Sequence, residues 1–189
     1  MIFNSHSNLS GTHAFLSASN SSWINYDEDK LDRVFHTTMA ARRGVELHAF
    51  AHEAIRLRIA MPETSATLNM YVNDAIGYKM TCEVCLYYSD NAYGHADCIS
   101  FRNEKQGPTL RIHDLKTGVN EASFDQLQIY AALFCLEYRV RPFEVKIELR
   151  IYQNDNVKVY IPDADDIMHI MEKIKYFDKR LNYLRSEES

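Results

Sequence analysis

The chain has 189 residues, of which 46% are hydrophobic and 25% charged, and its formal net charge at pH 7 is −5. This length is usual for one domain and is sufficient to bury a sizeable core. No apolar run approaches the length of a membrane span, and the first residues have neither a basic start nor a signal-type apolar core. We therefore expect a cytosolic protein. We also expect an irregular arm over residues 1–25 and a single domain over residues 26–189.

The first half of the domain shows helical and then strand periodicity. Apolar spacing predicts helices at residues 27–35, 40–60 and 63–77, with Pro62 ending the second of them. Three segments then alternate between apolar and polar residues: 80–88, 94–103 and 109–116. Turn-forming residues separate these segments, so they predict a three-stranded antiparallel meander.

The second half returns to a helical period, which runs from Phe124 to Tyr138. Residues 143–153 and 156–161 predict a hairpin around Asn154 and Asp155, and residues 163–185 predict a terminal amphipathic helix. The expected fold class is α/β of the α+β type. It has a central mixed sheet that contains the antiparallel three-stranded meander and is flanked by helices.

The segment Asp114-Leu-Lys116 carries the first sign of chemistry. The two charged residues are two apart in a predicted strand, so both side chains leave the same face. Cleavage of a phosphodiester uses a divalent cation held by hard oxygen ligands, for which Asp97 and Asp114 are candidates. Lys116 is placed to orient water or to stabilise charge on the phosphate. Taken alone, an Asp-x-Lys pair is also common on solvated edge strands.

Further motifs follow one another in a fixed order along the chain: Gly44-Val-Glu-Leu-His48, Gly94-His-Ala-Asp97, Asp114-Leu-Lys116 and Gln126-Leu-Gln-Ile-Tyr130. This order resembles the RecB-like branch of the PD-(D/E)XK nucleases, which have a restriction-endonuclease-like core. Segments 13–19, 23–25 and 150–153 resemble a bacteriophage group within that branch, and the resemblance covers residues 16–184.

The resemblance implies a Mg- or Mn-dependent deoxyribonuclease, in particular an exonuclease, acting in phage recombination or replication in the cytoplasm of a bacterial host cell. It implies the metal ligands His48, Asp97, Asp114 and the Leu115 carbonyl. It implies the catalytic set Asp97, Asp114, Lys116, Gln126 and Tyr130. Glu83 is a further candidate, for a second metal. The implied partners are DNA and a phage single-strand-binding or annealing protein. No membrane is expected as a partner, and the resemblance is compatible with an oligomer. Endo- against exonuclease action, polarity and strand preference stay open.

The four cysteines are Cys82, Cys85, Cys98 and Cys135. Some relatives carry a four-cysteine iron–sulfur cluster with one early and three late cysteines. This chain departs from that arrangement, and no iron–sulfur cluster is expected. Cys82 and Cys85 are three apart in a predicted strand and face opposite sides. We expect buried, reduced thiols, because structural disulfides are unusual in the cytosol.

His48 and His52 also have the four-residue spacing of a zinc-protease helix, but Ala49 stands where that motif needs its glutamate. The nuclease resemblance assigns His48 to the metal. His52 and Glu53 are either a pair that supports the metal ligands or ordinary surface residues, and we favour the surface. His95 and His113 adjoin the two aspartates in strands, so they should face away from the site.

A net negative charge does not exclude DNA binding when basic residues are clustered. Candidate DNA contacts are Arg42, Arg43, Arg56, Arg58, Arg102, Lys105 and Arg111. Two alternatives remain open beside the nuclease. One is a catalytically inactive nucleic-acid-binding module of the same fold, and the other is a phage protein that binds and inhibits a host defence complex.

Overall fold

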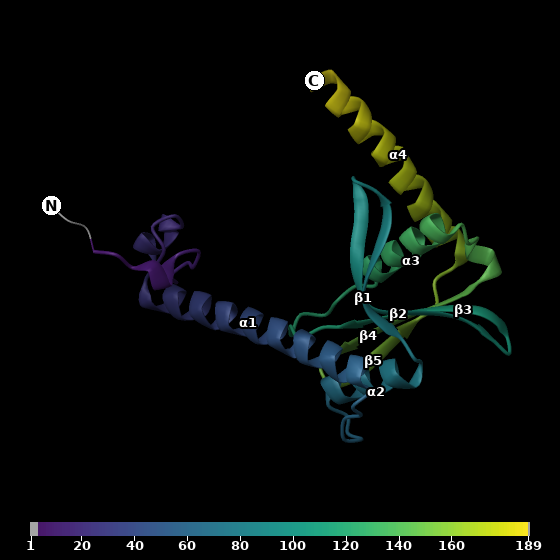
Figure 1. Cartoon of the computed structure of the whole chain (residues 1–189), viewed down its shortest axis with the longest axis horizontal. Helices are drawn as coiled ribbons and strands as arrows, with labels where there is room; N and C mark the ends of the chain where they lie inside the picture. Colours follow the sequence, from purple (N-terminus) through teal and green to yellow (C-terminus); the bar gives the residue numbers. More distant parts are fainter. Residues whose placement is uncertain (1–3, 189) are drawn as a thin grey trace. The chain divides into compact units, whose positions relative to one another are not determined.

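Five strands form one mixed sheet in the order β1-β2-β3-β4-β5 (Figure 1). Their bounds in this computed structural model are Thr81–Ser89, Ala92–Glu104, Gly107–Leu115, Lys146–Gln153 and Asn156–Tyr160. Strands β3 and β4 are parallel, and all other neighbours are antiparallel. The predicted mixed sheet, the meander and the second hairpin are therefore confirmed. The structure describes residues 4–188.

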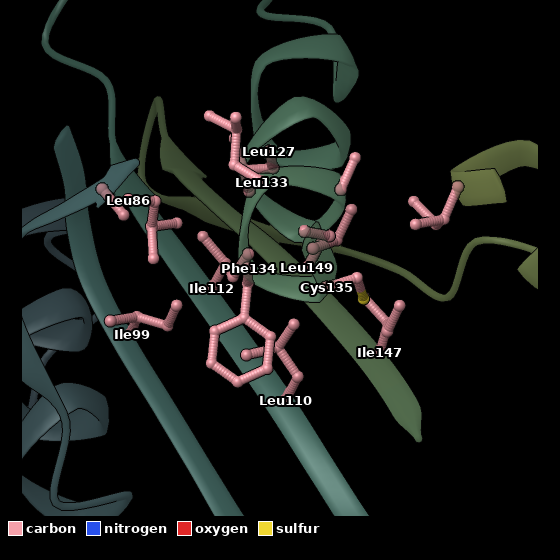
Figure 2. Close-up of a cluster of buried hydrophobic side chains, with 14 of the residues drawn as sticks. Leu86, Ile99, Leu110, Ile112, Leu127, Leu133, Phe134, Cys135, Ile147 and Leu149 are labelled. Carbon is pink, nitrogen blue, oxygen red and sulfur yellow. The ribbon is translucent and has the colours of Figure 1, made fainter. Parts of the chain in front are cut away.

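Helices cover both faces of the sheet. Helix α3 (Asp125–Tyr138) joins the parallel strands and packs on one face, where α4 (Ala164–Glu188) packs against it. Figure 2 shows Leu127 and Phe134 of α3 over Leu110, Ile112 and Leu149 of the sheet. Helix α2 (Thr67–Gly77) packs against β3 and β4. A second core cluster joins α2 to residues 51–55 of α1 (Glu28–Leu57) and to the sheet. The sheet thus has one apolar layer on each face.

The chain forms two compact units, Met1–Arg43 and Gly44–Ser189. The first contains two short 3-10 turns, η1 (Ser7–Leu9) and η2 (Ser21–Asn25), within an otherwise irregular segment that precedes α1. The Trp23 indole donates a hydrogen bond to the Ser17 carbonyl at 2.8 Å. The second unit contains the sheet. None of the helices between residues 4 and 188 is long and apolar enough to cross a membrane.

The two helices predicted at 27–35 and 40–60 are one continuous helix, so the predicted break was wrong. The break was placed at a threonine pair, but each hydroxyl donates a hydrogen bond to the carbonyl four residues earlier, Thr37 to Arg33 and Thr38 to Val34. These bonds satisfy the polar side chains inside the helix. The helix ends at Leu57, because Arg58 adopts a left-handed conformation (φ 55°) before Pro62 is reached.

Helix α2 begins at Thr67, four residues later than predicted. Its first N–H and the Thr67 hydroxyl both donate to Asp155 Oδ1, at 2.9 and 3.1 Å. Asp155 belongs to the β4–β5 turn, so a residue distant in sequence stabilises the helix start. A short helical turn, η3 (Pro142–Glu144), precedes β4 and occupies the start of the predicted strand.

Candidate active site

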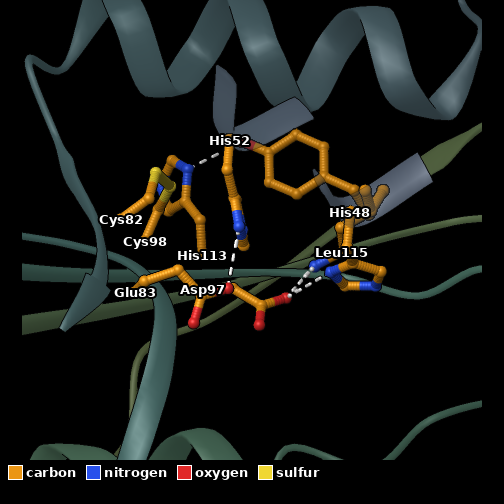
Figure 3. Close-up of a disulfide and its surroundings, with 9 residues drawn as sticks. His48, His52, Cys82, Glu83, Asp97, Cys98, His113 and Leu115 are labelled. Atoms are coloured by element: carbon orange, nitrogen blue, oxygen red, sulfur yellow. Dashed lines mark hydrogen bonds and ion pairs between the residues drawn. A yellow bond between two sulfur atoms is a disulfide. The ribbon is translucent and has the colours of Figure 1, made fainter. Parts of the chain in front are cut away.

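Strands β2 and β3 stop pairing at Cys98 and His113. Beyond that point the N–H of Leu115 donates to Asp97 Oδ2 at 3.1 Å, so a side chain replaces the missing strand acceptor. The same oxygen lies 3.5 Å from His48 Nδ1 (Figure 3). Three predicted site residues from α1, β2 and β3 therefore meet. Leu115 contributes its N–H to this contact. The resemblance implies a role for its carbonyl oxygen, which stays a prediction.

A row of hydrogen bonds links the remaining predicted residues. The Lys116 ammonium donates to Asp114 Oδ1 at 3.1 Å and to Gln126 Oε1 at 2.8 Å. The Gln126 amide in turn donates to the Tyr130 hydroxyl at 2.9 Å. Gln126 and Tyr130 are one turn apart on α3 and share a face, as their spacing predicts. The structure thus places all four side chains in one connected row.

Two glycines of the sequence motifs permit close packing at the site. A Cβ on Gly44 would lie 2.7 Å from Thr117 Oγ1, and a Cβ on Gly94 would lie 2.9 Å from Tyr130 Cε1. Both distances are shorter than ordinary carbon contacts. Gly44 therefore lets α1 approach the residue after Lys116, and Gly94 lets the Tyr130 ring rest on β2.

Asp114 is almost fully buried, with a relative exposure of 2%. Burial raises the pKa of Asp114, and the nearby charge of Asp97 raises it further, while Lys116 and His48 act in the opposite direction. Asp114 Oδ2 lies 2.9 Å from the Lys116 ammonium, yet no donor within residues 4–188 makes a well-aligned hydrogen bond to it. A buried carboxylate oxygen with remaining acceptor capacity favours a bound cation.

His52 lies beside His48 and Asp97 and is mostly buried, so the favoured surface position was wrong for this residue. Its Nδ1 lies 2.7 Å from Glu83 Oε1, and its side chain is only 16% exposed. Glu53 points elsewhere and forms an exposed ion pair with Arg56, which agrees with the surface expectation for Glu53. The shared helix face of His48 and His52 was visible in the sequence, but the strand partner Glu83 was needed to interpret it.

The expectation of reduced, buried thiols was wrong for two cysteines and partly wrong for a third. Cys82 and Cys98 face each other across β1 and β2 and form a disulfide, with a Cα–Cα distance of 4.0 Å (Figure 3). Cys85 is free but exposed, and only Cys135 is both free and buried. The two bonded residues are the same number of residues away from Asp90, which lies at the hairpin turn, so the hairpin brings them opposite each other. Comparing Cys82 only with Cys85 missed this signal.

The candidate DNA contact Arg111 is buried and paired with Glu104 and Glu148, so this assignment was wrong. Both carboxylates come from neighbouring strands, and they accept the hydrogen bonds that the Arg111 guanidinium would otherwise donate to DNA. His113 is also buried, with its Nδ1 3.2 Å from the Tyr152 hydroxyl. Burial, followed by the charges of nearby arginines, lowers the pKa of His113 to about 3, so this histidine stays neutral.

Gln153 is a positioning residue that sequence reasoning did not identify. Its amide donates to the Asn120 carbonyl at 2.7 Å, and its carbonyl oxygen accepts the Ala122 N–H at 3.1 Å. These bonds fix the connection between Lys116 and α3. A cavity of about 580 Å³ lies elsewhere, between α3 and α4, and none of the site residues lines it.

The donor atoms fit a divalent cation. One ligand atom each from His48, His52 and Asp97 lie within 4.8 Å of one another. Asp114 is not among these three residues, but its buried carboxylate on β3 is near enough to Asp97 for the two charges to interact. The chain matches no protein-family model and no curated protein.

Proposed function

We propose that this protein is a metal-dependent DNA nuclease of the RecB-like PD-(D/E)XK type. The observation that carries the proposal is the meeting of two carboxylates, Asp97 and Asp114, with the ammonium of Lys116 at the point where β2 and β3 diverge. In metal-dependent hydrolysis of a phosphodiester, hard oxygen ligands hold the divalent cation and a fixed ammonium stabilises charge on the phosphate.

His48, Asp97 and Asp114 are the residues that would hold the cation. A divalent cation supplies polarisation of the phosphoryl oxygen and a hydroxide at neutral pH. The burial of Asp114 strengthens its attraction for positive charge, since a desolvated carboxylate is costly without a partner. Asp97 is held in place by the Leu115 N–H, so its carboxylate keeps one orientation.

Lys116 supplies a positive charge in addition to that of the metal ion. Its ammonium is held between Asp114 and Gln126, which fixes a flexible side chain in one position. From there it can orient the attacking water or stabilise charge that develops on the phosphate. Tyr130 holds Gln126, so the α3 pair acts as a support for Lys116.

The test is cleavage of labelled linear double-stranded, linear single-stranded and circular DNA with Mg²⁺, Mn²⁺ or EDTA. The wild type is expected to degrade DNA only with a divalent cation. Asp114→Asn and Lys116→Met are each expected to reduce the rate by about a thousandfold or more. Cutting of circles would establish an endonuclease, and loss of linear DNA alone an exonuclease.

The matched control is Lys175→Met, because Lys175 is also an ion-paired lysine but lies on α4, paired with Glu172. This variant should cleave at the wild-type rate. Circular dichroism should show that all variants are folded. Wild-type rates in both Asp114→Asn and Lys116→Met would reject the proposal, and metal-dependent DNA binding without cleavage would favour the inactive binding module.

A further inference from the structure

His52 has two ring nitrogens in different situations. Nδ1 lies 2.7 Å from the Glu83 carboxylate, whereas Nε2 is buried and has no hydrogen-bond partner in the described part of the chain. A carboxylate on one ring nitrogen fixes the tautomer and leaves the lone pair of the other nitrogen available. Histidines that bind metals have this arrangement in most proteins.

His48 lies one helical turn before His52, and their ring centroids are 6.1 Å apart. A ligand atom from each, together with a carboxylate oxygen of Asp97, can be chosen so that all three lie within 4.8 Å of one another. We propose that His48, His52 and Asp97 form a transition-metal site that binds Mn²⁺ in preference to Mg²⁺, with Glu83 positioning His52. The proposal deepens the nuclease proposal by naming the metal, and it rests on that function only for the role of the metal.

The proposed preference for Mn²⁺ over Mg²⁺ follows from the types of ligand atom. Mg²⁺ prefers oxygen ligands and retains water, whereas imidazole nitrogens bind first-row transition ions more strongly. One histidine among carboxylates is compatible with either ion. Two histidines shift the preference toward the transition ion, and His52 is the residue that adds the second nitrogen.

The backbone of β1 brings Glu83 to this position. Glu83 has φ 55°, which is unusual for a residue within a strand, and it lies opposite Asp97 between the paired residues Cys82/Cys98 and Val84/Ala96. Strained residues of this kind persist where the surrounding structure holds them. The Cys82–Cys98 disulfide joins the strands directly beside both carboxylates, so it helps to maintain their separation.

A cavity of about 430 Å³ opens beside His52 and Glu83. Ala49, His52 and Arg56 of α1 line one side, and Cys82 and Glu83 of β1 line the other. The contact between His52 and Glu83 therefore borders an open cavity.

The experiment is calorimetric titration of the metal-stripped full chain with MnCl₂ and, separately, with MgCl₂. The wild type should bind Mn²⁺ at least about tenfold more tightly than Mg²⁺. His52→Ala should lose at least about tenfold in Mn²⁺ affinity while its Mg²⁺ affinity changes little, and Glu83→Gln should lose about tenfold. His169→Ala, which removes an exposed histidine on α4, is the matched control and should bind like the wild type.

A second readout uses the wild type alone. Paramagnetic Mn²⁺ should broaden the imidazole proton signals of His48 and His52 at substoichiometric concentrations and leave that of His169 sharp. Unchanged Mn²⁺ affinity in His52→Ala, or survival of the His52 signal when that of His48 disappears, would overturn the inference.

The two proposals fail in different ways. If Mn²⁺ binding depends on His52 but no DNA is cleaved with any metal, the metal site stands and the nuclease function is rejected. If DNA is cleaved but His52→Ala binds Mn²⁺ as the wild type does, the nuclease stands and this site is rejected.

Discussion

The ring of Tyr130 lies against the backbone of Gly94, since a Cβ there would be 2.9 Å from Tyr130 Cε1. This contact joins α3 to β2 beside the candidate site. The two motifs that contain these residues are therefore packed against each other.

Gly94→Ala should therefore displace the Tyr130 ring and destabilise the protein by about 1–3 kcal/mol, a usual cost of overpacking. Chemical denaturation measures this loss. Gly77→Ala is the matched control, because a Cβ added at Gly77 would have nothing within 4 Å of it. In a Tyr130→Ala background the effect of Gly94→Ala should largely disappear, and an equal effect in both backgrounds would contradict the contact.

Gln126→Ala should lower kcat by about tenfold with little change in KM, if the nuclease proposal holds. The reason is that Lys116 loses one of its two acceptors and samples more positions. Tyr130→Phe keeps Gln126 in the chain but removes its hydrogen-bond acceptor, so a smaller loss is expected. Single-turnover cleavage rates would test both variants. A larger loss of rate in Tyr130→Phe than in Gln126→Ala would be evidence that Tyr130 does not act through Gln126.

Asp114→Asn should increase stability at neutral pH in the presence of a chelator. Because burial raises the folded-state pKa of Asp114 above the ordinary value of 3.8, the wild type loses stability as pH rises from that value through the folded-state pKa. Asparagine has no charge to lose. The difference in melting temperature, variant minus wild type, should therefore grow as pH rises through the folded-state pKa of Asp114.

Asp178→Asn is the control of opposite sign. Hydrogen bonds from Ser89 and Asn91 lower the pKa of Asp178, so this carboxylate adds stability that is lost as pH falls through its folded-state pKa. Its variant should become less stable than the wild type as pH rises. The same pH trend in both variants would mean that the burial of Asp114 does not govern its titration.

Thiol reagents should divide the four cysteines into three classes. Cys85 is exposed and should react in the native protein, whereas burial raises the pKa of Cys135 to about 12 and should protect it until unfolding. Without reductant, the native protein should yield one thiol and the unfolded protein two. Reduction of Cys82–Cys98 should then give four. Four thiols in the unfolded, unreduced protein would show that the disulfide is absent.

The sequence was sufficient for the sheet because alternation and turn residues are local signals. The meander, the β4–β5 hairpin and the shared face of Asp114 and Lys116 all follow from them. The partners of His52 and Cys82 were not foreseen, because each depends on the register of a hairpin and on an irregular residue, Glu83.

Other errors arose from residue type. Arginine is usually exposed, so Arg111 was assigned to DNA, whereas Glu104 and Glu148 from other parts of the sheet neutralise it in the interior. Threonines disfavour helices, yet the hydroxyls of Thr37 and Thr38 bond within α1. Both cases needed tertiary or side-chain contacts that periodicity does not contain.

The Leu115 N–H on Asp97 and the Glu83 carboxylate on His52 hold in place two side chains that we propose as metal ligands. Ordering a flexible side chain on binding costs about 0.5–1.5 kcal/mol, and here folding has already met that cost. If a cation binds as proposed, the protein core rather than the incoming ion would set the shape of the coordination sphere, and ions that require a different shape would be at a disadvantage.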